Sequence, residues 1–274
     1  MSFQKRPNSS QVLGGDFSGV VAQAGPGTTT AVGTAVFGLS CSYWPQPAYQ
    51  GTYSEYACVR EEWTAPLPPG LDAQDAAAVP LVALTALQAL EKALPKPGQR
   101  ILINGASGGV GMFAVQLSKC IFDLQVVALS SPANADFVKS LGADTVCDYA
   151  DVESLVQQFS GSKFDIVFDV IGGALLDTCA SQLLAPGGVL THVRNRGGSQ
   201  EQVGRYETAA AEGGPAFKVT LVQPSGKQMA QLGGLFQAGK LVVRVVAKMP
   251  LEEAGKAHEM VITGKAGGKV VLTM

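Results

Sequence analysis

The residues best suited to chemistry in this chain form one glycine-rich segment, INGASGGVG, which runs from Ile103 to Gly111. The segment follows a short apolar strand and opens a helical pattern, and this context makes such a motif informative. Glycine lets the backbone turn tightly and approach a pyrophosphate, whose charge the amides and positive end of the next helix would hold. We therefore expect a dinucleotide-binding turn, with a flexible strand-to-helix turn as the alternative. The approach would be made by Ser107, Gly108, Gly109 and Val110.

The end of the next expected strand indicates which dinucleotide is bound. Domains that bind NAD commonly place an Asp or Glu there, about 20 residues after the turn, to hold the adenine ribose hydroxyls. Here the strand is followed by Ser130 and Ser131, with no carboxylate and no neighbouring Arg or Lys. Neutral serines leave room for a 2′-phosphate and can donate hydrogen bonds to it, which favours NADPH over NADH. Alternatively, the two serines only cap the next helix.

These residues need a parallel sheet to position them, and the pattern after residue 99 supplies one. Apolar strands alternate with amphipathic helices such as 133–141 and 174–184, which is typical of strands buried on both faces. The fold class we expect is α/β, with a doubly wound Rossmann sheet. Its six strands are expected at 100–104, 124–129, 145–147, 165–169, 189–193 and 218–222.

The segments on either side of this pattern differ from it in amino-acid composition. Residues 14–69 are rich in Gly, Thr, Val and aromatic residues and indicate irregular β structure, after which Asp72 is expected to cap a helix that Pro80 interrupts. Near the C-terminus, strands are expected at 241–246 and 269–272, with a helix between them. Both strands are expected to return to the sheet of the first domain, which is the β-rich part formed by residues 14–69.

Composition excludes several classes of function. The 20 basic and 22 acidic residues are scattered, so no cluster exists to neutralise a nucleic-acid backbone. No apolar run approaches the length of a membrane span, and the first residues lack the apolar core of a secretory signal. The five cysteines are far apart and odd in number, which favours reduced thiols. A cytoplasmic location is expected, with chloroplast or mitochondrion as alternatives.

Several strings together carry a family resemblance. The chain resembles the zinc-independent quinone oxidoreductase branch of the medium-chain dehydrogenase/reductases, and within it the chloroplast-envelope quinone oxidoreductase homologues and enone reductases. The resemblance implies a GroES-like β-rich domain at 1–71 and 240–274, with a shortened start, and a Rossmann domain at 72–239. The strings are GGDFSGVV (14–21), GTYSEYACV (51–59), AAVPLVALTALQAL (77–90), NGASGGVG (104–111), FVKSLGADTVCDY (137–149), FDIVFDVIGG (164–173) and GGKVVL (267–272).

The resemblance also implies roles for individual residues. Ser130, Asn134 and Tyr149 fall where the family contacts the 2′-phosphate, although Asn134 replaces a lysine that many members carry. Thr85 and Ile171, with the stretch after His192, fall near the expected nicotinamide pocket. The alternatives are an ordinary helix residue, a strand-end core residue and a loop.

No metal is expected. Where related alcohol dehydrogenases carry a His-Glu pair and a second cysteine as zinc ligands, this chain has Gly15, Asp16 and Leu81, and its two histidines are isolated. Without such a Lewis acid, a conjugated substrate is favoured, because hydride addition then places charge on an oxygen that hydrogen-bond donors can stabilise.

The sequence therefore predicts an NADPH-dependent, zinc-free reductase of quinones or of the C=C bond of α,β-unsaturated ketones. A catalytically weak NADPH-binding protein, which acts through a partner or as a cofactor sensor, is the alternative suggested by the short N-terminus. The catalytic residues, the proton donor and the exact substrate stay open, as does a homodimeric state.

Overall fold

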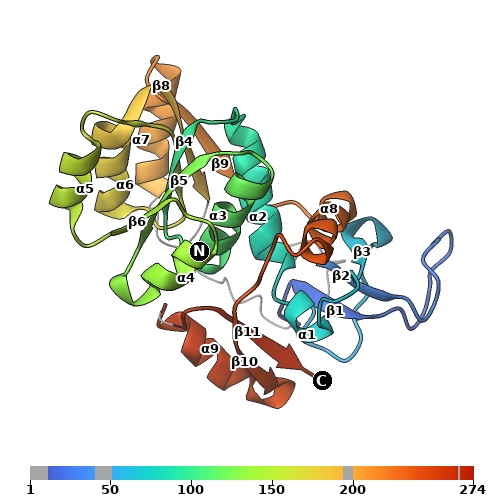
Figure 1. The fold of residues 1–274 in the computed structure, drawn as a ribbon. Coiled ribbons are helices and arrows are strands. Elements are labelled where there is room, and N and C mark those ends of the chain that lie inside the picture. The colour runs from blue at the N-terminus through green and yellow to red at the C-terminus, as the bar shows by residue number, and fades with distance from the viewer. Residues whose placement is uncertain (1–11, 41–50, 194–199, 265) are drawn as a thin grey trace. The chain divides into compact units, whose positions relative to one another are not determined.

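A six-stranded parallel sheet forms the centre of one half of the molecule, in the order β6-β5-β4-β7-β8-β9 (Figure 1). The order reverses between β4 and β7, which is the switch point of a doubly wound sheet. The predicted α/β Rossmann fold is thus confirmed. The strands are β4 (Arg100–Asn104), β5 (Gln125–Ser130), β6 (Thr145–Asp148), β7 (Phe164–Asp169), β8 (Leu184–Val193) and β9 (Ala216–Thr220).

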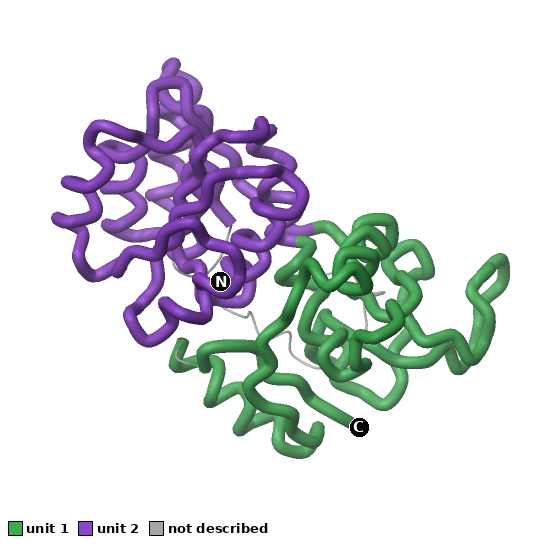
Figure 2. Tube along the Cα trace, viewed as in Figure 1, with its two compact units in different colours: residues 1–84, 223–274 green, residues 85–222 purple. Residues whose placement is uncertain are grey.

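This computed structural model describes residues 12–40, 51–193, 200–264 and 266–274. The chain divides into two compact units, one of residues 85–222 and the other of residues 1–84 with 223–274 (Figure 2). The unit of residues 85–222, which is unit 2 in Figure 2, lies within the range 72–239 that the sequence predicts for the Rossmann domain, whose limits remain a prediction.

Helices cover both faces of the large sheet. α3 and α4 lie on one face, whereas α5, α6 and α7 lie on the other (Figure 1). A core of buried side chains joins the second group to the strands, with Leu155 and Phe159 of α5 among them. The helices are α2 (Pro80–Ala93), α3 (Gly109–Cys120), α4 (Ala135–Ser140), α5 (Val152–Phe159), α6 (Gly173–Thr178) with the π-helical turn η3 (Cys179–Leu183), and α7 (Gln200–Ala211).

The other unit begins with antiparallel strands, as the composition of residues 14–69 predicts. β1 (Asp16–Val20), β2 (Ala35–Leu39) and β3 (Thr64–Pro66) form a three-stranded sheet, with η1 (Glu61–Trp63) before β3. Helix α8 (Gly226–Gln237) packs against β2 and β3. The short helix α1 (Ala73–Ala76) is capped by Asp72, whose carboxylate accepts from the N–H groups of residues 74 and 75, so this prediction is confirmed.

The C-terminal strands correct the sequence analysis. The strand expected at 241–246 is instead β10 (Val245–Pro250), whose residues alternate between partly buried and exposed. It pairs in parallel with β11 (Lys269–Thr273), and among the described residues these two form a separate sheet. The expected return to the sheet of the first domain is therefore wrong. The connection through η4 (Leu251–Glu253) and α9 (Ala254–Ile262) explains the pairing, because such a crossover lets neighbouring strands run parallel.

None of the helices in the described part of the chain is both long and apolar enough to cross a membrane.

Candidate functional site

The glycine-rich turn joins β4 to α3 at the carboxyl edge of the sheet. Gly105 has a φ of 85°, which favours glycine, and a Cβ on Gly111 would overlap the carbonyl oxygen of Gly105. Gly108 occupies the N-cap of α3, and no side chain caps this end of the helix. The N–H of Gly108 donates to the carbonyl of Gly105 at 3.1 Å, and Gly109 and Val110 begin α3 at its positive end, a position that fits a pyrophosphate.

The residues predicted to hold a 2′-phosphate lie at the ends of β5 and β6. Ser130 is only 2% exposed, and its hydroxyl donates to the carbonyl of Ser131 at 3.3 Å. The side chain of Asn134 donates to the hydroxyl oxygen of Ser131, also at 3.3 Å. Tyr149 follows β6, is half-exposed, and donates its N–H to the carbonyl of Ser130 at 3.4 Å. The structure thus brings Ser130, Ser131, Asn134 and Tyr149 together at the carboxyl ends of two neighbouring strands.

The capping alternative for the two serines is not adopted. Ser131 stands at the N-cap of the short 3-10 helix η2 (Pro132–Asn134), but its side chain makes no capping hydrogen bond. Sequence reasoning also missed a carboxylate nearby: Asp148 ends β6 in register with Ser130, and its Oδ1 accepts from the N–H of Ala150 at 2.9 Å.

A buried polar cluster underlies the switch point. Asp169, which is fully buried at the end of β7, accepts from Nδ2 of Asn104 at 2.7 Å and contacts Nδ1 of His192 at 2.7 Å. Because a carboxylate oxygen accepts, this geometry assigns a proton to Nδ1 of His192. The sequence analysis treated His192 as isolated, and this interpretation is wrong. The available signal was a polar residue at the carboxyl end of each of the three adjacent strands β4, β7 and β8.

The same carboxylate holds the loop after β7. Asp169 accepts from the N–H of Gly172 at 2.8 Å, and Gly172 has a φ of 79°. Ile171 is 49% exposed, and its side chain lies 3.0 Å from where a Cβ on Gly105 would stand. Ile171 and the glycine-rich turn are therefore neighbours at the switch point, where open α/β sheets bind ligands.

Thr85 lies elsewhere in the same unit, buried in α2. One turn later in that helix, the carbonyl of Ala89 accepts from the hydroxyl of Thr191 in β8 at 3.4 Å. α2 is thus fixed to the strand that carries His192. The role of Thr85 in a nicotinamide pocket stays a prediction.

The carboxylate at a would-be metal position has structural partners. Asp16 accepts from the N–H of Leu81 at 2.6 Å and pairs with Lys269 at 3.4 Å. Burial raises the pKa of Asp16, while the charge of Lys269 and the N–H of Leu81 oppose this shift. Within the described ranges, no group of three or more His, Cys, Asp and Glu side chains could hold a metal ion. Cys41 lies outside those ranges.

Comparisons with known proteins agree with this geometry. Residues 2–69 match the family described as alcohol dehydrogenase GroES-like domain, and residues 141–272 match the family described as zinc-binding dehydrogenase. The quinone-oxidoreductase homolog of Spinacia oleracea chloroplasts is 32% identical over 268 residues, which cover 95% of this chain and 79% of that protein. The 2-methylene-furan-3-one reductase of Solanum lycopersicum is 32% identical over 231 residues, covering 82% of this chain and 53% of the relative.

A solved structure of a quinone oxidoreductase has the same fold. The quinone oxidoreductase from Coxiella burnetii superimposes with a TM-score of 0.86 at 30% identity, and the match covers 97% of this chain and 80% of that one. The chain therefore belongs to the medium-chain dehydrogenase/reductase family of oxidoreductases that bind a nicotinamide cofactor, and its relatives include quinone oxidoreductases and enone reductases.

Proposed function

We propose that this chain uses NADPH, without zinc, to reduce quinones or the C=C bond of α,β-unsaturated ketones. The observation that carries the proposal is the carboxyl edge of the sheet. There the glycine-rich turn lies at the end of β4, the neutral residues Ser130 and Ser131 lie at and just after the end of β5, and Ile171 follows β7. These features fit a dinucleotide laid across the switch point.

Each part of the cofactor has candidate partners in the chain. The backbone of 107–110 would hold the pyrophosphate, and the adenosine 2′-phosphate would lie against the β5 and β6 ends. Ile171 and Thr85 would flank the nicotinamide ring, which supplies a hydride when the cofactor is bound. The half-exposed side chain of Ile171 offers an apolar surface that excludes water from this end. The 2′-phosphate partners would be Ser130, Ser131, Asn134 and Tyr149.

The preference for NADPH over NADH is expected to be modest. Asp148 stands beside Ser130 in the sheet, and a carboxylate there would repel a 2′-phosphate. Its hydrogen bond from Ala150 turns one oxygen toward the backbone and so reduces this effect.

The substrate class is supported by the relatives and by chemistry. The Solanum lycopersicum relative is named for a substrate with a methylene group conjugated to a ketone, and the Spinacia oleracea relative for quinones. In both substrate types, the charge that develops on hydride addition spreads onto an oxygen, which hydrogen-bond donors can stabilise in place of a metal. The proton would come from solvent or from a tyrosine.

The test is cofactor oxidation by the purified protein with a panel of quinones, enones, saturated aldehydes and saturated ketones. We expect NADPH consumption with the first two classes and none above background with the last two. Binding of NADPH without turnover of any conjugated carbonyl would replace the proposal with the alternative, a cofactor-binding protein that acts through a partner or as a sensor.

A further inference from the structure

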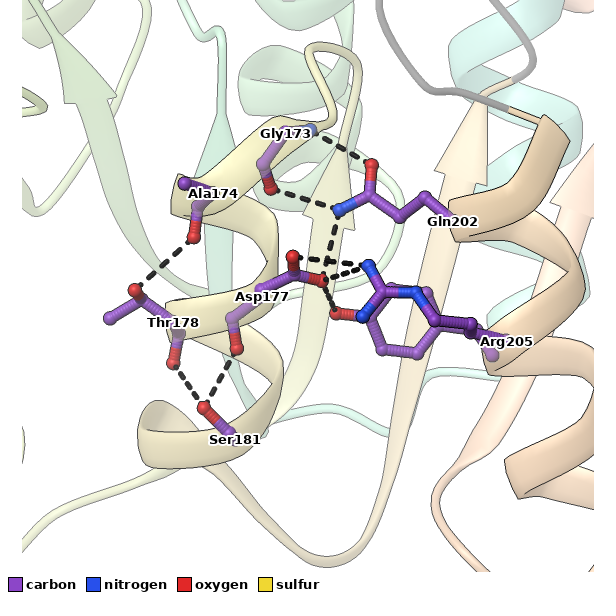
Figure 3. Close-up of polar contacts among 8 residues, drawn as sticks. Gly173, Ala174, Asp177, Thr178, Ser181, Gln202 and Arg205 are labelled. Carbon is purple, nitrogen blue, oxygen red and sulfur yellow. Dashed lines mark hydrogen bonds and ion pairs between the residues drawn. The ribbon is translucent and has the colours of Figure 1, made fainter.

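The side chain of Gln202, in α7, bonds both backbone groups of Gly173, the first residue of α6 (Figure 3). Its Oε1 accepts from the N–H of Gly173 at 2.9 Å, and its Nε2 donates to the carbonyl of Gly173, also at 2.9 Å. The same Nε2 donates to Oδ1 of Asp177 at 2.9 Å. Gln202 is 5% exposed, whereas Gly173 is itself exposed, so these contacts act mainly by holding the conformation of Gly173 and not by satisfying buried backbone groups.

Gln202 also helps to attach its helix. It is the only buried residue of α7, all of which the structure describes. A pocket of about 210 Å³ lies between α7, α6 with η3, and the strands β8 and β9, and its lining includes Leu190, Tyr206 and Phe217. Beside this pocket the ring of Tyr206 packs against that of Phe217, with 5.3 Å between the ring centroids, and the polar contacts of Gln202 add to this packing in fixing the helix.

Asp177 orients Gln202 and ties it to two further side chains. Tyr206 donates its hydroxyl to Oδ1 of Asp177 at 2.6 Å, and Arg205 pairs with the other oxygen at 3.3 Å. Burial acts to raise the pKa of Asp177, but the hydrogen bonds from Tyr206, Gln202 and Arg205 hold it below its ordinary value. The carboxylate therefore stays ionised near neutral pH and keeps Nε2 of Gln202 turned toward it.

The loop between β7 and α6 is consequently held on both sides of its glycine pair. Asp169 binds the N–H of Gly172, while Gln202 binds both groups of Gly173. The two glycines have φ values of 79° and 76°, a region that leaves the chain free to adopt other conformations if these contacts are lost. Ile171 immediately precedes them and lies against the glycine-rich turn.

We propose that Gln202 is a positioning residue for the nicotinamide end of the cofactor: it fixes Gly173, and through it the loop that carries Ile171. The inference rests on the proposed function, since it assumes that Ile171 faces the nicotinamide. It assigns to α7 a role at one end of the cofactor only, because the candidate partners of the 2′-phosphate lie on other elements, at the ends of β5 and β6 and on η2.

The test compares two ligands on wild-type protein and on Gln202→Ala. One ligand is NADPH, and the other is the same dinucleotide without its nicotinamide ring, 2′-phospho-ADP-ribose. Loss of the contacts to Gly173 is expected to raise the Kd of NADPH about tenfold, while the Kd of the truncated ligand changes less than about twofold. Isothermal calorimetry gives both constants without any need for turnover.

Two further variants keep the test interpretable. Arg205→Ala removes a partner of Asp177 on the exposed side and leaves the contacts to Gly173 in place, so both constants should stay at their wild-type values. Gln202→Glu keeps the side-chain size but cannot donate to the carbonyl of Gly173 and faces Asp177, so it should weaken NADPH selectively, as the alanine variant does. It also serves if Gln202→Ala does not fold.

The outcomes separate the two proposals. Equal weakening of both ligands in the Gln202 variants, or no weakening of either, would overturn the positioning role alone. If the wild-type protein binds neither ligand, the proposed function fails and the inference falls with it.

Discussion

Asp169 offers the most demanding test of how the switch point is built. Its carboxylate accepts from three donors: Nδ2 of Asn104 at 2.7 Å, the N–H of Gly172 at 2.8 Å and Nδ1 of His192 at 2.7 Å. Each buried donor left without an acceptor costs about 1–3 kcal/mol, and water entering the vacated space recovers part of this. Asp169→Ala is therefore expected to lower the free energy of unfolding by about 3–5 kcal/mol.

Asp169→Asn should be much milder, at about 1–2 kcal/mol, because the new amide keeps the volume and one acceptor oxygen. That oxygen can still accept from Gly172 and His192, while Asn104 can rotate its own amide to accept from the new NH₂ group. NADPH affinity should follow the same order, with the alanine variant weaker than the asparagine variant, since the loop that bears Ile171 loses its anchor only in the first.

Urea unfolding followed by far-UV circular dichroism measures the stabilities, and calorimetric titration measures NADPH affinity. An alanine variant that loses no more stability than the asparagine variant would refute the reasoning, because three orphaned donors would then carry no cost. If Asp169→Ala shows the whole expected decrease in the free energy of unfolding but binds NADPH with unchanged affinity, the buried cluster does not act on the cofactor loop.

Three other predictions concern charged groups. Asp148→Asn should raise the affinity for NADPH relative to NADH by roughly threefold to tenfold, because it removes a carboxylate beside Ser130; an unchanged ratio in calorimetric titrations would place the 2′-phosphate elsewhere. Hydrogen bonds from Thr30 and Thr29 hold the pKa of Glu61 at about 2, below its usual 4.5, so the stability they give is fully present above pH 4.5 and is lost as the pH falls toward 2. The difference in Tm between wild-type protein and Glu61→Gln should therefore shrink over that range, and a constant difference would contradict it. Because Asp16 is engaged by structural partners, purified protein should hold less than stoichiometric zinc by elemental analysis and keep its reductase activity after chelation; stoichiometric zinc lost together with activity would overturn this.

Local pattern was enough to predict the elements that form the large sheet. A buried parallel strand is a short apolar run, and Arg100–Asn104 has the predicted bounds because Gly98 and the glycine-rich turn delimit it sharply. The N-cap at Asp72 was equally visible, since capping depends on residues that are adjacent in sequence.

The mistaken strand at 241–246 shows where pattern fails. The run Leu241-Val242-Val243 is as apolar as a strand, but Leu241 alone is buried there, and pairing starts only at Val245. Which residues pair was decided by β11 and the crossover helix between the two strands, and neither is a local property of the run.

The contacts that build the site were hidden for a similar reason. His192 meets Asp169 across 23 positions in the sequence, and Gln202 meets Gly173 across 29. Residue type suggests that each polar side chain needs a partner when buried, but only the order of the strands decides which partner is near. The glycine-rich turn, in contrast, is continuous in sequence, and its residues could be named without the fold.

The central claim, hydride transfer from NADPH to a conjugated carbon, is tested most directly by isotope. The protein would be incubated with an enone and with NADPH deuterated at C4 of the nicotinamide, using each of the two stereospecifically labelled forms in turn, and the product would be analysed by NMR. We predict a saturated ketone that carries deuterium on the former β-carbon with one of the two forms. Deuterium on the carbonyl carbon of an alcohol, or no transfer from either form together with no NADPH consumption with a quinone, would contradict the account.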